Sequence, residues 1–417
     1  MRPSKVCYLS TGIMDTAFDS QVFPLLTRAP VSGFDLLHIA FDPFYYKVTD
    51  RYSEKKKELN SIGIETFYLR QTPPFAKASL LIDEKRIFNI LDSWWEKREK
   101  VVIHCRGHLN AYRGLLLKKR NPDLTHVIAD LRGLVADEVI QKSRGLAGKY
   151  FISHLRKFYL WVERQVILQA DTILCVSKVF KEYLEANYNI KKITVIPTFV
   201  DTSRFKYSKS LRDLYRGKLG ISNQCVFIYS GGTAPWQKID SAISLFNHLS
   251  RKVGNLFMLF LTHEPHLVKR MIKDQINPKD FKVIGVPHGE VAGYLCAADV
   301  GILLRKKTLT NHVASPIKFS EYMCCGLPCI ISSHIGDTAE ILLHGNAGIV
   351  LDSDLDFPSL SDFQTLLSLN RDEISDLMYS NFSSDIFIPE ILRFYENIAE
   401  KQGINSHVRN LRGNRLR

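Results

Sequence analysis

The 417-residue chain lacks a long hydrophobic run. A membrane-spanning helix requires about 20 consecutive apolar residues, whereas the most apolar run, residues 256–261, is only as long as a buried strand. Residues 1–5 also lack the apolar core and small-residue cleavage site of a signal peptide. We therefore expect the protein to be made and kept in the cytoplasm.

Cysteine is scarce, with eight residues, and most of them lie within apolar runs, as Cys7 and Cys105 do. Cysteines in such positions usually behave as small buried hydrophobic residues. Cys324, Cys325 and Cys329 show neither the spacing of a metal site nor a histidine pattern nearby. We expect no disulfide framework in a cytoplasmic chain of this size.

Acidic residues do not balance the basic ones: 43 Asp and Glu stand against 56 Lys and Arg, which gives a net charge of +13. Such a charge favours an anionic partner, namely nucleic acid, an anionic lipid surface or a nucleotide diphosphate. Residues 97–120 carry eight basic side chains and one acidic side chain, Glu99. This cluster is a solvated face by default, and peripheral contact with a membrane is its second interpretation. Nucleic acid comes last, because no binding module is recognisable.

Short apolar runs alternate with longer amphipathic segments along the chain, which is typical of β-α repeats around parallel sheets. Several runs are nearly continuous in Val, Ile and Leu, as strands covered on both faces should be. We expect strands at residues 5–10, 36–41, 65–69, 101–105, 126–130, 172–176, 194–197, 226–230, 256–262, 282–286, 300–304, 328–332 and 348–351.

The two series of strands are separated by a polar, charged stretch at residues 201–218. The chain is too long for one ordinary core, so two α/β domains with a cleft between them are expected. The predicted parts are an N-terminal Rossmann-like domain at 1–198, a C-terminal Rossmann-like domain at 199–386, a helix at 387–400 that returns to the first domain, and a basic tail at 401–417. For the tail, disorder is one interpretation.

Residues 315–322 read Ser-Pro-Ile-Lys-Phe-Ser-Glu-Tyr and predict the start of a helix. Ser315 is a good N-cap residue, and Pro316 suits the first helical position. The free N–H groups of such a helix end attract phosphate, whereas a cation at Lys318 opposes the helix dipole unless an anion is present. Glu321 lies on the same helix face, where its carboxylate could accept hydrogen bonds from a ribose diol. The alternative is an exposed ion pair between Lys318 and Glu321.

Ligands of open parallel sheets bind at the carboxyl ends of the strands, and polar or glycine residues follow several predicted strands. In the second series these residues are Gly231, Gly232, Lys238, Val286 and His288, and in the first series they are Gly12, His104, Arg106, His108, Asp130, Arg132 and Glu138. Arg132 suits an anion. For His104, His108 and Asp130, a structural role is an equal alternative.

Several of these segments resemble glycosyltransferase family 4, which comprises retaining enzymes of the two-domain GT-B fold. Residues 315–322 are similar to the family's Ser-Pro-x-Lys-x-x-Glu-Tyr, residues 170–173 to its Ala-Asp-x-Ile, and residues 196–201 to its Ile-Pro-Asn-x-Val-Asp at the domain crossover. The commoner form of the family has Glu-x7-Glu instead, and Val313 occupies the position of its first glutamate.

The resemblance implies roles for the candidate residues. Lys238 would neutralise the diphosphate leaving group, Glu321 would bind the ribose hydroxyls, and Val286 and His288 would line the base pocket. It implies a donor site formed by Gly12, Gly231, Gly232, Val286, His288, Ser315, Pro316, Lys318 and Glu321, with catalytic roles for Lys238 and Lys318. From their positions after strands of the first series, we expect catalytic roles for His104 and Asp130 and an acceptor side formed by Arg106, His108, Arg132 and Glu138.

We therefore predict an α/β protein of the GT-B fold, whose two Rossmann-like domains carry parallel sheets that face across a cleft. Its expected reaction is the retaining transfer of a sugar from a nucleotide sugar to a glycan or lipid-linked acceptor, in cell-surface polysaccharide or glycoconjugate synthesis. No metal cofactor is expected, because lysines and a helix end stabilise the leaving group and the Asp-Ser-Asp at 352–354 falls in a late loop. The alternatives are a nucleotide-sugar epimerase of the same fold and a non-catalytic, nucleotide-sugar-binding subunit of a transferase assembly.

Overall fold

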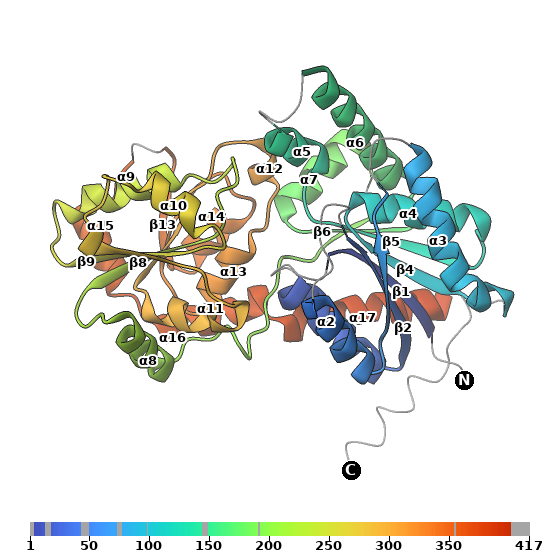
Figure 1. Ribbon diagram of the computed structural model, residues 1–417, viewed down its shortest axis with the longest axis horizontal. Helices are drawn as coiled ribbons and strands as arrows, with labels where there is room; N and C mark the ends of the chain where they lie inside the picture. The colour runs from blue at the N-terminus through green and yellow to red at the C-terminus, as the bar shows by residue number, and fades with distance from the viewer. Residues whose placement is uncertain are drawn as a thin grey trace, which may run out of the picture. The chain divides into compact units, whose positions relative to one another are not determined.

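The computed structural model describes residues 4–12, 18–42, 50–72, 77–97, 99–143, 149–190, 192–353 and 356–401. Asp354 and residues 402–417, which belong to the Asp-Ser-Asp segment and the basic tail, lie outside the described residues. The chain divides into two compact units (Figure 1). Unit 1 comprises Met1–Val176, Lys181–Ile196 and Asp385–Arg417, and unit 2 comprises Ser177–Phe180 and Pro197–Ser384.

Unit 1 is built around a seven-stranded parallel sheet with the order β3-β2-β1-β4-β5-β6-β7. Its strands are β1 (Ser4–Thr11), β2 (Phe34–Asp42), β3 (Glu65–Arg70), β4 (Val101–Arg106), β5 (Thr125–Leu131), β6 (Thr172–Cys175) and β7 (Ile193–Val195). Its helices are the π-helix Phe18–Val22, α1 (Phe23–Val31), α2 (Asp50–Ser61), α3 (Lys77–Glu96), α4 (His108–Arg120), α5 (Val135–Ser143), α6 (Lys149–Gln169), α7 (Lys178–Tyr188) and α17 (Ser384–Lys401). The first residues of α7 and of α17 are assigned to unit 2.

Unit 2 contains a six-stranded parallel sheet with the order β10-β9-β8-β11-β12-β13. Its strands are β8 (Cys225–Ser230), β9 (Leu256–Leu261), β10 (Phe281–Ile284), β11 (Val300–Leu303), β12 (Cys329–Ser332) and β13 (Gly348–Leu351). Its helices are α8 (Lys209–Leu219), α9 (Ile239–Ser250), α10 (Pro265–Met271), the 3-10 helix Pro278–Asp280, α11 (His288–Ala297), α12 (Leu309–His312), α13 (Ile317–Cys324), α14 (Thr338–His344), α15 (Leu360–Leu367) and α16 (Arg371–Phe382).

The thirteen strands predicted from the sequence are all present, and their observed ends differ from the predicted ones by two residues at most. The prediction of two Rossmann-like halves with parallel sheets is confirmed. Strand β9 shows why the apolar runs of the sequence predicted the strands, because all six of its residues are buried. Phe257, Leu259 and Leu261 enter the core on one face of the sheet, and Leu256, Met258 and Phe260 enter the core on the other. Full burial of one such side chain stabilises the fold by about 1.5–3 kcal/mol.

Both sheets change the direction of their strand order at one point. The reversal lies between β1 and β4 in unit 1 and between β8 and β11 in unit 2. At such a point the loops that leave two adjacent strands run to opposite sides, which opens a crevice at the carboxyl ends of the strands. The topology therefore marks the edge with Thr11, Gly12 and Arg106 in unit 1 and the edge with Ser230 and Leu304 in unit 2.

The C-terminal helix α17 completes the core of unit 1 (Figure 1). Tyr395 of this helix is 0% exposed. Its ring packs edge-on against Phe34 with a centroid distance of 5.5 Å, and its hydroxyl lies 2.8 Å from Nδ1 of His104. Unit 1 is thus assembled from both ends of the chain, with unit 2 inserted between them.

The two segments that enter and leave unit 2 are paired with each other. Val200 and Ser383 form a parallel β-bridge, in which the Val200 N–H donates to the Phe382 carbonyl (2.8 Å) and the Ser384 N–H donates to the Val200 carbonyl (2.9 Å). The hydroxyl groups of Thr202 and Ser383 add a buried hydrogen bond of 2.9 Å. Because these polar groups are buried, the bridge satisfies backbone atoms that would otherwise be costly to bury.

Arg371 at the start of α16 joins the ends of two other helices. Its guanidinium donates five hydrogen bonds of 2.6–3.1 Å to the carbonyl groups of Leu295, Cys296, Ala298, Cys325 and Gly326. These carbonyls lie at the C-terminal ends of α11 and α13, where a helix has no partner of its own for its last four carbonyl groups. Burial lowers the pKa of Arg371, and its five donors make it a shared cap for both helices.

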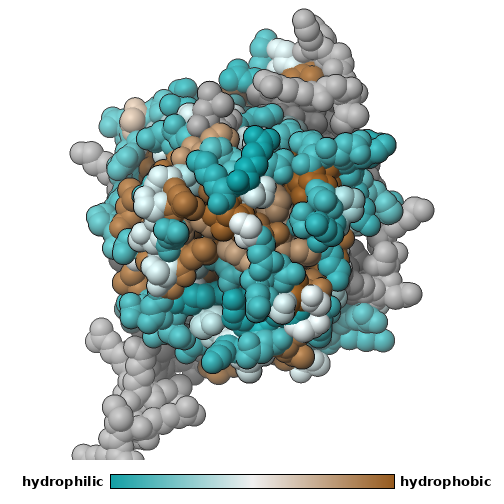
Figure 2. Space-filling view, turned by 90° about the vertical axis from the view of Figure 1, so that its left-hand side faces the viewer, coloured by the Kyte–Doolittle hydropathy of each residue, from teal (hydrophilic) through white to brown (hydrophobic). Residues whose placement is uncertain are grey.

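None of the described helices is both long enough and apolar enough to span a bilayer. On the face of unit 2 that Figure 2 presents, hydrophobic and hydrophilic side chains are interspersed. The exposed large hydrophobic residues of this unit come from separate helices and include Leu214, Leu267, Leu343 and Leu377. Single exposed apolar residues of this kind are ordinary on a protein surface.

Substitution of Arg371 tests the shared cap. Arg371→Met keeps much of the side-chain volume but removes five hydrogen bonds, and among the described residues only the carbonyl groups of Cys296 and Ala298 keep a second donor, Arg212. We therefore expect a loss of about 3 kcal/mol in the free energy of unfolding. This corresponds to a fall of roughly 6–12 °C in the melting temperature of a unit of this size. Differential scanning calorimetry measures the shift. The exposed Arg251→Met serves as the control, and equal melting temperatures for the two variants would rule out the shared cap.

Candidate functional site

The predicted donor residues of unit 2 follow the carboxyl ends of its strands, and backbone contacts bring their segments together. The Lys238 N–H, just before α9, donates to the carbonyl of Leu304 at the end of β11 (3.2 Å). The Ser230 N–H, at the end of β8, donates to the hydroxyl of Tyr322 in α13 (2.8 Å). The glycine loop after β8, the end of β11 and helix α13 therefore meet at the edge that the sheet topology marks.

The start of α13 differs from the prediction. The helix begins at Ile317, so that Pro316 rather than Ser315 occupies the cap position, and no cap hydrogen bond to a side chain is made there among the described residues. The hydroxyl of Ser315 instead accepts a hydrogen bond from the N–H of Thr198 (3.1 Å). The prediction that Ser315 caps the helix is wrong, because the segment that follows β7 occupies its hydroxyl. A helix N-terminus without a side-chain cap suits an anion.

Glu321 is the most enclosed of the predicted donor residues, with a side chain that is 0% exposed. Its Oε2 lies 3.0 Å from Nζ of Lys318, and its Oε1 lies 3.3 Å from Nε2 of His288. Burial raises the pKa of the carboxyl, but the Lys318 ammonium and the His288 side chain outweigh it and lower the pKa below its usual value. The Lys318–Glu321 ion pair is therefore partly enclosed, with Glu321 buried and the Lys318 side chain 18% exposed, rather than fully exposed as in the alternative interpretation.

His288 brings the loop after β10 to the same place. It is the first residue of α11, follows Val286 and Pro287, and has a 6% exposed side chain. Its ring packs against Phe205 with a centroid distance of 5.5 Å. Lys318 and His288 thus hold one carboxylate from two helices, and each of its oxygens retains a second lone pair for a further donor.

The loop that contains Gly231 and Gly232 is braced from both sides. The hydroxyl of Tyr229 donates to the Gly232 carbonyl (2.7 Å), and the Gly231 N–H donates to the carbonyl of Leu261 (2.9 Å). A Cβ atom on Gly232 would lie only 2.9 Å from side-chain atoms of His263 and Glu264. A larger residue at position 232 would therefore require the ends of these two side chains to shift.

Arg305 is a residue of this edge that the sequence interpretation missed. It follows β11, and its backbone forms an antiparallel bridge with Gln237, next to Lys238. Its Nη1 donates to Oδ1 of Asn311 (3.2 Å), and its carbonyl accepts a hydrogen bond from Nε2 of His334 (2.9 Å). Because Arg305 comes just after a strand beside the topological switch point, its position in the sequence could have predicted that it lies at this edge.

The corresponding edge of unit 1 contains four side chains in one network. Asp130 at the end of β5 lies 3.2 Å from Nη1 of Arg132 and 3.4 Å from Nη1 of Arg106. Oε1 of Gln21 accepts a hydrogen bond from Nη2 of each arginine, at 2.6 Å from Arg106 and 2.7 Å from Arg132. Burial raises the pKa of Asp130, but the two arginines and His104 outweigh it, so the carboxyl has a lowered pKa and is ionised.

His104 lies beneath this network. It is 1% exposed, its Nδ1 faces the Tyr395 hydroxyl, and its Nε2 lies 3.7 Å from Oδ2 of Asp130. Its ring packs against Tyr8 with a centroid distance of 4.7 Å. The predicted pair His104 and Asp130 is thus brought together, and its catalytic role stays a prediction.

The other predicted residues of unit 1 are His108, Glu138 and Gly12. His108 begins α4 and faces Glu163 of α6, with 3.9 Å between Nε2 and Oε2. Both side chains are buried, so burial lowers the pKa of His108 to about 4 and raises that of Glu163 to about 7. Glu138 is half-buried on α5, and Gly12 ends β1 with a φ of +69° and donates its N–H to the Phe41 carbonyl (2.9 Å).

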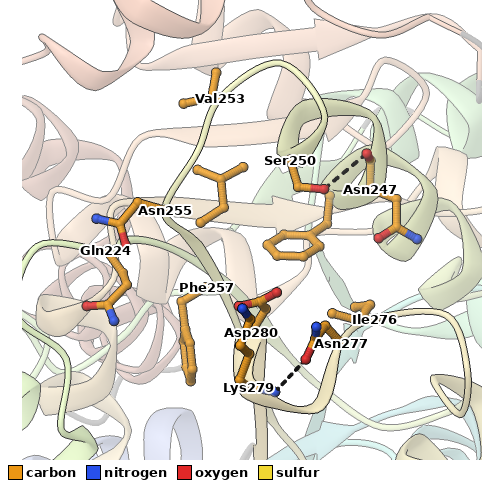
Figure 3. A pocket seen from close by; sticks show the side chains of 12 residues that line it. Gln224, Asn247, Ser250, Val253, Asn255, Phe257, Ile276, Asn277, Lys279 and Asp280 are labelled. Atoms are coloured by element: carbon orange, nitrogen blue, oxygen red, sulfur yellow. Dashed lines mark hydrogen bonds between the residues drawn. The ribbon is translucent and has the colours of Figure 1, made fainter.

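A cavity in unit 2 lies at the opposite edge of its sheet (Figure 3). Gln224, Asn255 and Asp280 line it from just before β8, β9 and β10, so it faces the amino-terminal ends of these strands. Two of the hydrogen bonds drawn there join residues of the lining, from Ser250 to the Asn247 carbonyl and from the Lys279 N–H to Asn277. The cavity is therefore distinct from the edge where the predicted donor residues meet.

Comparison with protein families covers both units. Residues 52–204 match the family Glycosyltransferase Family 4, and residues 212–373 match the family Glycosyl transferases group 1. The two matches together include most of the chain and most of the predicted site residues. The chain is a family 4-like glycosyltransferase.

Solved structures confirm the GT-B fold of this glycosyltransferase. Sucrose-phosphate synthase from Thermosynechococcus elongatus has a TM-score of 0.70 at 13% identity, with 95% of this chain and 100% of that chain covered. A glycosyltransferase from Rickettsia africae has a TM-score of 0.66 at 13% identity, with 95% and 99% covered. Anabaena HepE in complex with UDP and glucose also has a TM-score of 0.66 at 13% identity, with 94% and 99% covered. The curated proteins gave no match.

The buried pair of His108 and Glu163 makes the stability of the glycosyltransferase depend on pH. Because the pKa of Glu163 is raised from 4.5 to about 7 on folding, its contribution is fully present below pH 4.5 and is lost as pH rises to 7. Glu163→Gln removes this titration, so the variant should gain about 3 kcal/mol relative to the unsubstituted protein between pH 4.5 and 7.5. Urea unfolding at a series of pH values measures the gain.

The same experiment has an internal check. The exposed Glu182→Gln on α7 should give a pH profile parallel to that of the unsubstituted protein. His108 contributes with the opposite sign in both proteins, because its pKa is lowered and its neutral form is favoured as pH rises, so it cancels in the difference. Parallel profiles for Glu163→Gln as well would show that Glu163 does not titrate with a raised pKa.

Proposed function

We propose that this glycosyltransferase takes its sugar from a nucleotide diphosphate donor bound at the carboxyl edge of the unit 2 sheet. The observation that carries the proposal is the buried carboxylate of Glu321 held between Lys318 and His288, beside a helix end without a side-chain cap. This arrangement offers a carboxylate for ribose hydroxyl groups and backbone N–H groups with a lysine for phosphate. Both kinds of group belong to one nucleoside diphosphate.

The remaining donor residues fit this arrangement. Val286 and His288 would line the pocket for the base, and Gly231 and Gly232 would let the loop backbone approach the phosphates. Ser315 and Pro316 would position the end of α13 through the Ser315 hydrogen bond to Thr198. Gly12 of unit 1 would face the donor from the end of β1.

The chemical step would be assisted mainly by cations. As the bond between the sugar and the diphosphate breaks, negative charge builds on the leaving phosphate and the sugar takes on oxocarbenium character. Lys238, Lys318 and the N-terminus of α13 would stabilise that charge where it develops. We propose that these groups suffice, so that transfer proceeds with retention and without a metal ion.

The acceptor side would be formed by unit 1. Arg106, His108, Arg132 and Glu138 would bind a glycan or lipid-linked acceptor, with His104 and Asp130 nearest the reacting groups. Exposed basic side chains of residues 97–120, such as Lys97 and Lys119, fit peripheral contact with an anionic membrane on its inner face, where lipid-linked acceptors are found, whereas Arg113 of the same segment is buried against Asp83. We propose that the enzyme acts in cell-surface polysaccharide or glycoconjugate synthesis.

Binding of UDP tests the donor site. Lys318→Ala removes one charge-assisted contact worth about 2 kcal/mol, so the Kd for UDP should rise roughly 30-fold by isothermal titration calorimetry. The exposed Lys252→Ala in the same unit is the matched control and should bind UDP normally. Because Lys318 also pairs with Glu321, the melting temperature of each variant is recorded to confirm that it is folded. Unchanged UDP affinity in Lys318→Ala would remove this residue from the donor site.

Chelation tests the role of the cationic groups. If lysines and a helix end stabilise the leaving group, treatment with EDTA should leave the rate of sugar release from the nucleotide sugar unchanged within about twofold. The release of nucleoside diphosphate is followed with and without EDTA. Loss of activity with EDTA that Mg²⁺ restores would contradict the proposal of a metal-independent step.

A further inference from the structure

We propose that the cavity at the amino-terminal edge of the unit 2 sheet is a binding site for a neutral sugar residue. This site is separate from the donor site, because the cavity faces the amino-terminal ends of β8, β9 and β10, whereas the donor residues follow the carboxyl ends of the strands. It lies wholly within unit 2. Three properties of its lining point to this ligand: amide groups with open ends, an apolar wall, and balanced charge.

Two asparagines of the lining have acceptor ends that the protein leaves open. Nδ2 of Asn247, on α9, donates to the Gln275 carbonyl (3.0 Å), and Nδ2 of Asn255 donates to the Asn223 carbonyl (2.9 Å). These bonds fix which end of each amide is the nitrogen. In the part of the chain that the structure describes, neither Oδ1 atom accepts a hydrogen bond. Each is therefore available to accept from a ligand hydroxyl group.

Two further amides of the lining have open donor ends. Oε1 of Gln224 accepts from the Ser222 N–H (3.0 Å), and Oδ1 of Asn277 accepts from the Lys279 N–H (3.2 Å). Among the described residues, Nε2 of Gln224 and Nδ2 of Asn277 donate to no other group. The lining thus offers both donors and acceptors. A sugar requires both, because each of its hydroxyl groups donates one hydrogen bond and also accepts.

The polar side chains surround one volume. Figure 3 shows Gln224 and Asn255 on one side of the cavity and Asn247 and Ser250 on the other. Asn255 is fixed by its backbone, which has a φ of +62° and whose carbonyl accepts from the Cys225 N–H at the start of β8 (2.9 Å). This left-handed conformation is costly for most residues other than glycine, and asparagine is among those that tolerate it best. The rim of the cavity is therefore held in place by the sheet.

The cavity also has an apolar wall. Phe246 and Leu256 contribute to it, and both are buried. The C–H groups on the face of a sugar ring can pack against such a wall while the hydroxyl groups reach the amides. The cavity has a volume of about 280 Å³, just below the usual range of ligand pockets, about 300–1,000 Å³. It therefore suits a single sugar ring rather than a whole nucleotide.

Charge in the lining is balanced. Lys279 and Asp280 are the one basic and the one acidic residue among the described residues that line the cavity, so an anion gains no net attraction there. The Asp280 carboxylate can also accept a hydrogen bond from a sugar hydroxyl group. The ligand that fits is a neutral sugar residue, either a free monosaccharide or the end of a glycan chain.

The test measures sugar binding to the full-length protein with saturating UDP, so that the donor site is already filled. The probes are the methyl glycosides of glucose, galactose and mannose at up to tens of millimolar, followed by saturation-transfer difference NMR. Asn255→Gly removes one amide and suits the left-handed backbone, and Ser250→Phe at the end of α9 fills the cavity. The exposed Ser244→Phe on the same helix is the matched control. The melting temperature of each variant confirms that it is folded.

We expect at least one of these glycosides to bind with a Kd in the millimolar range. That Kd should rise about fivefold in Asn255→Gly, as for one lost hydrogen bond, and binding should be abolished in Ser250→Phe and unchanged in the control. Binding of none of the glycosides, or equal binding by Ser250→Phe and the unsubstituted protein, would overturn the proposal. A loss of UDP affinity in the two cavity variants would assign the cavity to the nucleotide and overturn it as well.

A second arm identifies the source of the sugar. The disaccharide that ends in the bound sugar should bind at least as tightly as the methyl glycoside if the cavity takes the end of a glycan chain, and more weakly if only a free monosaccharide fits. Either result supports the cavity as a sugar site. Failure of the proposed donor site would show differently, as a lack of UDP binding by the unsubstituted protein, and leaves the sugar titration unaffected.

Discussion

The structure depends on the fact that both parallel sheets are covered on both faces. Strand β9 illustrates the constraint, since every one of its residues is buried and apolar. Most of the polar residues that could take part in a reaction therefore lie at or near the ends of strands, although His38 is buried within β2. At the carboxyl edges they gather beside the two points where the strand order reverses.

Charged side chains are arranged similarly at the carboxyl edges of the two units. Each edge contains an enclosed carboxylate that orients two basic side chains: Glu321 contacts Lys318 and His288, and Asp130 contacts Arg106 and Arg132. In both cases the nearby basic groups lower the pKa of the carboxyl against the effect of burial, so it is ionised. The carboxylate thus fixes the direction of its partners' side chains.

The sequence predicted the fold well because the signal for a buried strand is local. Short apolar runs marked every strand, and several were nearly continuous in Val, Ile and Leu, as strands covered on both faces should be. The glycosyltransferase site was predicted less completely, because its contacts join distant parts of the chain. Ser315 was expected to cap its own helix, but it binds Thr198, 117 residues away. Gln21 and Tyr395 were missed, since only folding brings Gln21 to Arg106 and brings Tyr395 to His104 across 291 residues.

Because α17 returns to unit 1, recombination between two such enzymes cannot exchange a whole unit through a single junction. Tyr395 and its neighbours belong to the core of unit 1, although they are encoded after the whole of unit 2. A recombination event that replaced everything after Ile196 would therefore remove a piece of the core of unit 1 together with the whole of unit 2. A functional chimera requires two junctions between the parent sequences, one near Pro197 and one near Asp385. The segments that follow the first junction and precede the second must come from the same parent, because Val200 and Ser383 pair with each other.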